Sequence, residues 1–439
     1  MTGRERMAAA MRLEKPDRTP VMCQLAIGHY FLNTTVPRED IWFSAEGFAE
    51  ALVTLARRYR FDGVLVNLLP APPDWRKEIA RTTDEGDGTR VIEWRGGGGC
   101  RIPPDDNLHH SPAYQPPSLE AVEPGALWYD DPHGVGGMRH PFRFRDGAMQ
   151  SAKCTMHNVQ RTETKSIGNK QWPMANCQGT MDGGRRTTER RTGDGGPGTA
   201  KGRVGTNGYF PEYLFRTVEM LRGRVGEELS VHAEVFSPFT QLMELFGYGD
   251  ALMHLVTDAE KCEAMLARYA GGTAELAGEF ARRGADAVLV SSAFAGAGFI
   301  SREYYRRFVQ PYERPVVEAV KAASPRTPVY VHTCGAIGDR LEMMVETGYN
   351  GIDTLDPPPL GNVDLADAVK RLRGKAFIKG NMDPVGTLLN GTPETVRRDA
   401  RMRLETAGRE GGYILSSACS VAPRVRPENL AVLAEEAEK

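Results

Sequence analysis

Residues 284–334 read GADAVLVSSAFAGAGFISREYYRRFVQPYERPVVEAVKAASPRTPVYVHTC, and this stretch decides the fold. Two short apolar runs, 285–291 and 327–334, flank the segment 302–323, whose apolar residues recur at helical spacing. Short apolar strands separated by a helix are typical of parallel strands that are buried on both faces. The stretch therefore predicts a strand–helix–strand unit of an α/β protein.

The same alternation continues in both directions along the chain. Further strands are predicted at residues 20–27, 62–69, 229–236, 351–356, 376–380 and 412–417. Further helices are predicted at residues 45–60, 250–283, 337–347, 365–372, 393–407 and 427–436. Eight strands predict one (β/α)8 TIM-type barrel with an N-terminal extension and an irregular insertion. A doubly wound open sheet is the alternative.

Composition excludes several classes of protein. The 439 residues are 41% hydrophobic with a formal net charge of -2, so bulk charge favours no nucleic-acid partner. No apolar run approaches the roughly 20 residues of a membrane helix, so no membrane association is expected. Residues 1–15 are charged and lack the apolar stretch of a signal peptide, which predicts a cytoplasmic protein.

The chain divides into three parts. Residues 1–132 form the N-terminal part of the barrel, with a hairpin or loop excursion at 75–101, and residues 208–439 form its remainder. Residues 140–207 between them contain two Val, one Ile and no Leu, too few apolar side chains to offset the entropy of ordering. We interpret 133–207 either as a disordered insertion or as a stretch translated out of frame.

Three residues have the chemistry of a metal site. The seven cysteines are odd in number and irregularly spaced, which favours metal binding or catalysis over a disulfide framework. His332 and Cys334 lie two residues apart in VHTCG, so they project from one face at the end of a strand. Cys419 follows the last strand, and barrels place their chemistry at the carboxyl ends of strands.

One imidazole and two thiolates suit zinc, and three protein ligands leave a position for water or substrate. We therefore predict a metal site at His332, Cys334 and Cys419 and no catalytic residue beyond it. The alternative is a core histidine with two ordinary buried cysteines.

Weaker candidates for substrate binding follow two other strands. His29 and Tyr30 come after the first predicted strand, and a plain loop role is the alternative for both. Asn381 and Asp383 lie in GNMDP just past a strand, where their side chains can instead fix the loop by bonding its backbone. The glycines at 96–99 are no phosphate loop, because no GxxxxGK[ST] frame surrounds them.

Five motifs together resemble those of a known family: EKPDRTPV (14–21), GADAVLVSS (284–292), FVQPYERPVVEAVK (308–321), GNMDPVGTLLNGTPETV (380–396) and GGYILSSACSVAPRVRPENL (411–430). On these residues the chain resembles the uroporphyrinogen decarboxylase superfamily, over more than half of its length. The resemblance implies a TIM-type barrel. Ser291 and Ser292 depart from it, because they replace an acidic residue that is common at that strand end in the family.

Two branches of this superfamily differ at their sites. True decarboxylases carry an Arg-Gln-Ala-Gly-Arg motif whose arginines hold the substrate's propionates, but residues 24–31, QLAIGHYF, contain no arginine. Corrinoid-dependent methyltransferases have H-x-C late in the barrel and a cysteine in the last strand's motif, which His332, Cys334 and Cys419 match. The resemblance therefore favours the branch that transfers methyl groups between methylcobalamin and thiols.

A fourth metal ligand is suggested by a more distant resemblance to cobalamin-independent methionine synthase, which adds a carboxylate to its zinc. Asp356 ends the strand after H-x-C, and Glu234 lies near the end of an earlier strand. Both can reach the mouth of a barrel. A turn or cap role is the alternative for Asp356, and a buried, hydrogen-bonded strand residue is the alternative for Glu234.

The resemblance implies zinc-dependent methyl transfer between a methylated corrinoid and a small thiol. On this resemblance, the corrinoid is supplied as methylcobalamin or by a separate small corrinoid protein. The direction of transfer and the oligomeric state stay open. Two rivals remain, namely a decarboxylase-like lyase that needs no metal and a catalytically degenerate member that binds a corrinoid protein.

Overall fold

The computed structural model describes residues 1–127, 142–145, 148–151 and 210–439. Within the predicted segment 133–207, the description covers the antiparallel pair β6 (Phe142–Arg145) and β7 (Ala148–Ser151). The rest of that segment, and with it the choice between an insertion and a frameshift, lies outside the described residues. The described parts before and after the segment belong to one compact unit.

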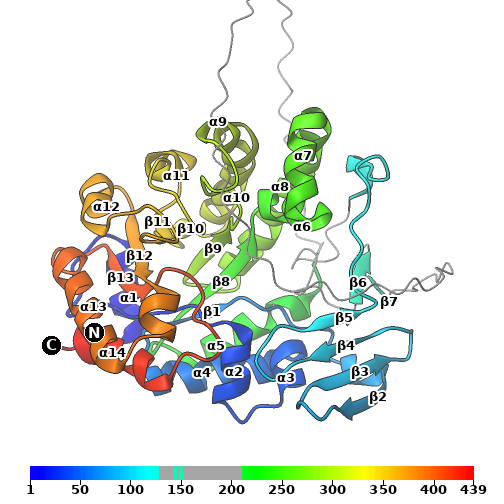
Figure 1. Ribbon diagram of the computed structural model, residues 1–439, viewed down its shortest axis with the longest axis horizontal. Coiled ribbons are helices and arrows are strands. Elements are labelled where there is room, and N and C mark those ends of the chain that lie inside the picture. Colours follow the sequence, from blue (N-terminus) through cyan, green and yellow to red (C-terminus); the bar gives the residue numbers. More distant parts are fainter. Residues whose placement is uncertain (128–141, 146–147, 152–209) are drawn as a thin grey trace, which may run out of the picture. The chain divides into compact units, whose positions relative to one another are not determined.

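A parallel sheet forms the centre of this unit (Figure 1). Its strands, in spatial order, are β1 (Gly63–Val66), β8 (Ser230–Phe236), β9 (Ala287–Ser291), β10 (Val329–His332), β11 (Gly351–Thr354), β12 (Phe377–Met382) and β13 (Tyr413–Ser417). Every neighbouring pair is parallel, and chain order equals spatial order. Strands that follow one another in this way around a curved sheet define a (β/α)8 barrel rather than a doubly wound sheet.

Residues 21–25 take the eighth place and close the barrel. Val21 bridges Leu415 of β13 in parallel, and its carbonyl accepts a hydrogen bond of 2.8 Å from the backbone N–H of Asp62, just before β1. A second bridge joins Leu25 to Val421. The predicted strand at 20–27 is therefore shorter than expected, because helix α2 begins at Ile27.

Helices cover the outside of the sheet (Figure 1), except the first, which precedes every strand and packs against one end of the barrel interior. They are α1 (Gly3–Met11), α2 (Ile27–Asn33), α3 (Arg38–Phe43), α4 (Ala45–Tyr59), α5 (Arg216–Val225), α6 (Pro238–Phe246), α7 (Tyr248–Thr257), α8 (Ala259–Arg282), α9 (Arg302–Tyr304), α10 (Gln310–Ala323), α11 (Leu341–Thr347), α12 (Leu365–Leu372), α13 (Pro393–Ala407) and α14 (Pro427–Ala437). Short 3-10 helices are η1 (Trp75–Glu78), η2 (Pro124–Ala126) and η4 (Glu212–Phe215), and short π-helical segments are η5 (Tyr305–Val309) and η6 (Pro384–Leu389).

Most of the predicted helices match these bounds within a few residues. The long helix predicted at 250–283 is instead two, α7 and α8, which meet at Asp258. The Asp258 carboxylate accepts a hydrogen bond of 3.1 Å from the backbone N–H of Lys261. It therefore caps α8, and a cap of this kind marks the start of a new helix.

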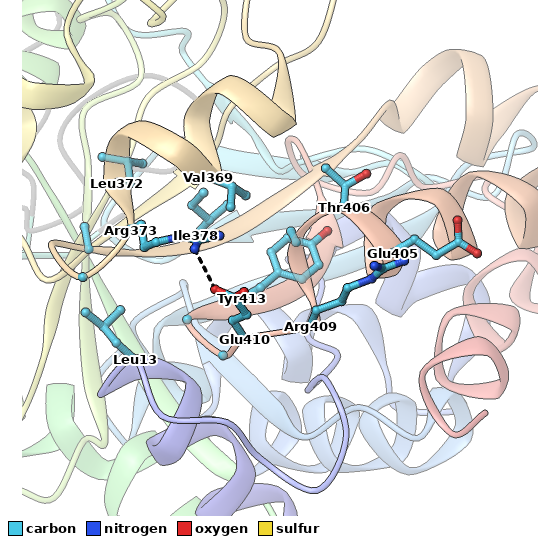
Figure 2. Close-up of a pocket in the computed structure, with 15 residues that line it drawn as sticks. Leu13, Val369, Leu372, Arg373, Ile378, Glu405, Thr406, Arg409, Glu410 and Tyr413 are labelled. Atoms are coloured by element: carbon cyan, nitrogen blue, oxygen red, sulfur yellow. Dashed lines mark ion pairs between the residues drawn. The ribbon is translucent and has the colours of Figure 1, made fainter.

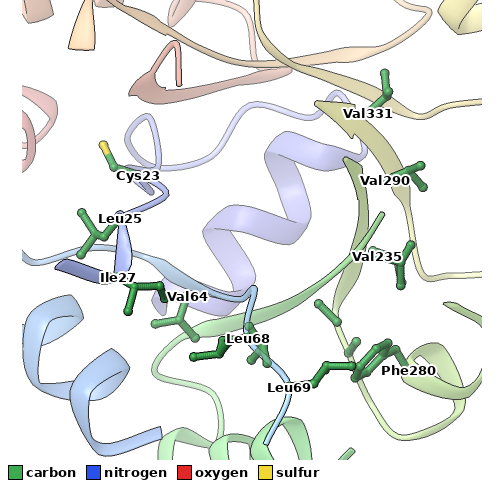
Figure 3. Close-up of a cluster of buried hydrophobic side chains, with 14 of the residues drawn as sticks. Cys23, Leu25, Ile27, Val64, Leu68, Leu69, Val235, Phe280, Val290 and Val331 are labelled. Carbon is green, nitrogen blue, oxygen red and sulfur yellow. The ribbon is translucent and has the colours of Figure 1, made fainter. Parts of the chain in front are cut away.

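Apolar side chains pack on both faces of the strands. The outward face contacts the helices in one large cluster, of which Figure 3 shows Val64, Val235, Val290 and Val331. A second, smaller cluster fills the amino-terminal end of the barrel interior, where helix α1 packs its methionines against Leu65, Leu289, Tyr330, Phe377 and Ile414. The interior is thus sealed at one end, which leaves the carboxyl ends of the strands for a site.

The predicted excursion at 75–101 is a separate antiparallel sheet. Its strands are β2 (Ile79–Asp84), β3 (Arg90–Trp94), β4 (Gly99–Ile102) and β5 (His109–Ser111). Gly97 and Gly98 have φ of 93° and 71°, and they form the turn between β3 and β4. Among the described residues, no helix is long and apolar enough to cross a lipid bilayer.

A buried ion-pair cluster fastens α1 to the barrel. Asp62 is 2% exposed, and its carboxylate accepts hydrogen bonds from Arg6 of α1, from Arg18 and from the backbone N–H of Val21. Arg18 belongs to the segment EKPDRTPV. The segment therefore has a structural role at the closed end of the barrel.

Replacing Asp62 with Asn should lower the free energy of unfolding by about 3 kcal/mol or more, because two arginines lose a buried counter-charge. Urea unfolding followed by circular dichroism measures the change. The control is Glu14→Gln at the exposed pair with Arg12, for which no measurable change in stability is expected because solvent screens exposed charges. Equal stabilities of the Asp62 and Glu14 variants would contradict the role of Asp62.

Candidate metal centre

His332, Cys334 and Cys419 come together at one end of the barrel. His332 is the last residue of β10, Cys334 lies two residues further on, and Cys419 lies two residues beyond the end of β13. Within the described parts of the chain these residues form the one group of three that can hold a metal ion, and their ligand atoms lie within 4.8 Å of one another. The three predicted ligands thus converge.

The distances within this trio fit a tetrahedral metal. Cys334 Sγ lies 3.4 Å from His332 Nε2 and 3.6 Å from Cys419 Sγ. With zinc–sulfur bonds of about 2.3 Å, tetrahedral geometry separates two sulfur ligands by roughly 3.8 Å. Both cysteines are free thiols. The donor set and its spacing therefore fit zinc.

Asp353 and Lys379 extend the centre into the barrel interior. His332 Nδ1 lies 3.3 Å from Asp353 Oδ2, and the Lys379 ammonium donates to both carboxylate oxygens of Asp353, at 3.0 and 3.2 Å. Neither residue was singled out from the sequence. The signal that could have found them is the polar residue in the middle of the apolar strands GIDTLD and AFIKG.

Electrostatics within the trio favour a thiolate at Cys419. The hydrogen bond from Cys334 and the nearby His332 imidazole hold the pKa of Cys419 well below its usual value, although burial opposes this. The hydrogen bond to Cys419, together with burial, raises the pKa of Cys334. Burial disfavours the charged imidazole, but Asp353 and Cys419 outweigh it and raise the pKa of His332 to about 10.

Asp356 lies next to the metal centre with one oxygen engaged. Its Oδ2 accepts a hydrogen bond of 2.6 Å from the backbone N–H of Gly335, immediately after Cys334. Its Oδ1 is buried and has no hydrogen-bond partner in the described structure. Burial, and to a lesser degree the Cys419 thiolate, raise the pKa of Asp356. Asp356 is not one of the three residues whose ligand atoms lie within 4.8 Å of one another.

Glu234 lies on β8, the strand next to β9. Burial raises its pKa to about 7, while His332 and a hydrogen bond with Ser291 act in the opposite direction. Like Asp356, it lies outside the cluster of three ligands. Glu234 nevertheless lies two residues after His232, which contacts Tyr330 of the interior cluster, so strand alternation turns Glu234 to the barrel interior as well.

His29 and Tyr30 are packed into the protein. His29 is fully buried, with Nε2 2.8 Å from the Tyr59 hydroxyl and Nδ1 3.0 Å from the carbonyl of Pro423. Tyr30 packs its ring edge-on against Phe48. These contacts give His29 a structural role, joining α2 and α4 to the segment after Cys419, and a substrate-binding role for either residue stays a prediction.

Asn381 and Asp383 both fix the backbone near β12. The Asn381 amide donates to the Leu355 carbonyl at 2.9 Å and accepts from Arg403. Asp383 accepts from the backbone N–H groups of Val385 and Gly386, both at 2.8 Å, and so caps η6. These contacts match the structural alternative for the two residues, and substrate binding by either of them stays a prediction.

One cavity of about 440 Å³ lies at the opposite end of the barrel strands (Figure 2). It is bounded by Gly374 and Ala376 before β12, by Gly411 and Gly412 before β13, and by the ion pair of Arg373 and Glu410. Parallel strands share their direction, so a cavity at their amino ends is remote from the cysteines. It takes no part in the metal centre.

The loop after β9 packs against the metal loop. A Cβ on Gly296 would lie 2.5 Å from the Cys334 carbonyl oxygen, so only glycine allows this approach. The Ala297 N–H donates to the Ala336 carbonyl at 2.7 Å. The same loop carries Phe294 and Phe299, whose rings contact each other. The loop that contacts the Cys334 backbone therefore carries two aromatic side chains.

The fold and the candidate site define the class of this protein as a TIM-type barrel with one histidine and two cysteines at the carboxyl ends of its strands. Comparison with known families shows which family of barrels it belongs to. The sequence model of the family "Uroporphyrinogen decarboxylase (URO-D)" matches residues 208–439, more than half of the chain. The chain belongs to the uroporphyrinogen decarboxylase family, as its motifs predict.

Two curated relatives have different activities, one a methyltransferase and one a decarboxylase. "Methylcobamide:CoM methyltransferase MtbA" of Methanosarcina acetivorans is 29% identical over 236 residues, which are 54% of this chain and 63% of the relative. "Uroporphyrinogen decarboxylase" of Chlorobium phaeobacteroides is 36% identical over 158 residues, which are 35% of this chain and 41% of the relative. The chain therefore spans less than two thirds of the curated relatives it matches.

The solved structure of a "methyltransferase from Methanosarcina mazei" superimposes with a TM-score of 0.63. The match covers 100% of this chain and 98% of that one, at 14% sequence identity. At this identity the likeness concerns the fold alone, and it confirms the predicted TIM-type barrel.

Replacing Cys334 or Cys419 with Ala should abolish tight zinc binding, because two ligands rarely hold zinc against competition. The measurement is zinc content by mass spectrometry after metal-replete purification and gel filtration. Cys262→Ala, at a buried cysteine of α8, is the matched control and should keep the zinc of the unmodified protein. Zinc retained in both ligand variants would remove the site.

The buried His29 makes stability depend on pH. Burial lowers its pKa in the folded protein to about 4, against about 6.5 when unfolded. Below pH 6.5 the unfolded chain binds a proton that the folded one does not, so stability is complete above pH 6.5 and falls towards pH 4. Between pH 7 and pH 4 the protein should lose roughly 3 kcal/mol more than His29→Asn. Parallel pH dependences of urea unfolding would contradict this assignment.

Proposed function

We propose that this chain catalyses zinc-dependent methyl transfer between a corrinoid and a thiol. The observation that carries the proposal is the convergence of His332 Nε2, Cys334 Sγ and Cys419 Sγ at the mouth of the barrel. The family, and the methylcobamide:CoM methyltransferases among the relatives, support it. The absence of arginine from residues 24–31 speaks against the decarboxylase-like alternative.

The metal that fits this donor set explains the choice of a thiol as substrate. Zinc held by two thiolates and an imidazole would bind a substrate thiol and keep it deprotonated near neutral pH. The thiol proton would leave to solvent, and the substrate sulfur would attack the methyl carbon carried by the corrinoid. A sulfur–carbon bond forms, the cobalt–carbon bond breaks, and its electron pair stays on cobalt. In the opposite direction the same bonds are exchanged in reverse.

In this proposal, the residues of this chain hold the zinc ion and leave a place for the thiol beside it. His332, Cys334 and Cys419 would be the metal ligands, and a fourth position stays open for the thiol. The free oxygen of Asp356 makes it our first choice for an additional ligand when no thiol is present, with Glu234 as the other candidate. Zinc affinity of Asp356→Asn and Glu234→Gln distinguishes the two.

The corrinoid would approach from the open end of the barrel. Tyr248 and Phe299 are 59% and 40% exposed, and they contact Phe294 on the loop beside Cys334. Exposed aromatic rings of this kind suit a large, flat, largely apolar ligand. We also propose that a small corrinoid protein carries the corrinoid and that the protein works in the cytoplasm.

Residues 133–207 are proposed to separate the two parts of the barrel sequence, residues 1–132 and 208–439.

The test is methyl transfer from methylcobalamin to a panel of small thiols, followed by the absorbance change of the corrinoid. The zinc-loaded protein should transfer methyl groups, and Cys419→Ala should be slower by roughly 100-fold or more, because the metal contributes several kcal/mol to thiol activation. Cys262→Ala should react like the unmodified protein. Equal rates with and without zinc, or a fully active Cys419→Ala, would exclude the proposed reaction. Decarboxylation of a porphyrinogen by metal-free protein would instead favour the lyase.

A further inference from the structure

We propose that Asp353, backed by Lys379, is a positioning residue that holds the His332 imidazole in the orientation and tautomer needed for metal binding. The inference rests on the proposed function, because it concerns the same metal centre. Asp353 on β11 and Lys379 on β12 would thereby support the three candidate ligands from two further strands.

Strand register places the three side chains side by side. In the parallel pairing of β10 with β11, His332 lies opposite Asp353, and in the pairing of β11 with β12, Asp353 lies opposite Lys379. Residues opposite one another on neighbouring strands point to the same face of the sheet. The backbone itself therefore aligns an imidazole, a carboxylate and an ammonium in one row across three strands.

The three side chains of the row are buried, and each contacts a partner within the row. His332 is 5% exposed, and Asp353 and Lys379 are 1% exposed each. Both carboxylate oxygens of Asp353 accept from Lys379, and one of them also faces His332 Nδ1. A buried carboxylate needs a counter-charge to stay ionised, and Lys379 supplies it independently of His332. Asp353 can therefore remain an anion while His332 is neutral.

A neutral imidazole carries one N–H, and its metal-binding nitrogen must be the other one. An anion beside Nδ1 draws the proton to that nitrogen and leaves the lone pair on Nε2. Nε2 is the nitrogen that lies 3.4 Å from Cys334 Sγ. The hydrogen bond also fixes the rotation of the ring. Partners of this kind orient metal-bound histidines, and their loss typically weakens metal affinity roughly 10–100-fold.

A purely structural ion pair is the competing interpretation, and a double variant separates the two. Asp353→Asn alone leaves Lys379 as an unpaired buried cation and can destabilise the fold. Asp353→Asn combined with Lys379→Met removes both charges, a change that proteins often tolerate without loss of stability. The amide at 353 presents either its oxygen or its nitrogen to the ring, so it no longer selects the tautomer.

The experiment measures zinc affinity of the full-length protein at one fixed pH, by competition with a chromogenic chelator, together with the thermal unfolding of the metal-free forms. We expect the double variant to unfold near the temperature of the unmodified protein and to bind zinc roughly 10–100-fold more weakly. The matched control is Glu436→Gln, which alters a buried carboxylate paired with Arg397 and Arg401 between α13 and α14. It should keep the original zinc affinity.

The outcomes distinguish this inference from the proposed function. Undiminished zinc affinity in the folded double variant overturns the positioning role, while the methyltransferase proposal stands. An equal loss of affinity in Glu436→Gln also overturns it, because the effect is then general. Weaker zinc binding specific to the double variant supports the inference even if no thiol is methylated, in which case the proposed reaction alone fails. A protein that binds no zinc at all overturns both.

Discussion

The curvature of the parallel sheet is the constraint on which the candidate metal centre depends. Strands β10 and β13 are separated by β11 and β12. In a flat sheet, three steps between strands would hold them roughly 14 Å apart. Cys334 Sγ and Cys419 Sγ are 3.6 Å apart, because the sheet curls and brings together the segments that follow β10 and β13. The hydrogen bonds of residues 21–25 to β13 and to Asp62 maintain this curl.

The interior of the barrel changes in character along its axis. At the amino end, α1 and apolar side chains fill the space, and Asp62 with its two arginines fastens that plug. Towards the carboxyl end, the strands present His332, Asp353 and Lys379, which are buried but fully paired. Charges in such a setting are costly unless each has a partner, so their presence distinguishes this end of the barrel from the apolar end and makes it the candidate site.

The relatives of this chain include both decarboxylases and methyltransferases, and the fold does not choose between them. The choice rests on the donor atoms. Two sulfurs and an imidazole nitrogen within 4.8 Å of one another suit a zinc ion and a thiol substrate, and they have no evident use in a reaction that needs no metal. The support for methyl transfer therefore comes from the site, with the relatives as a second line.

Local patterns in the sequence determined the strands and helices, the family, and the common face of His332 and Cys334, since a two-residue spacing on a strand depends on the backbone alone. They also placed Cys419 at a strand end. They did not reveal Asp353 and Lys379, because register between strands is set by contacts far apart in the chain. For the same reason they left His29 open between a substrate-binding and a plain loop role and did not reveal its contacts with Tyr59 and Pro423. The sequence by itself determined which ligands are available. Only the curled, closed sheet decided that they meet and which buried partners hold them, because the distance between two strand ends is a property of the whole barrel.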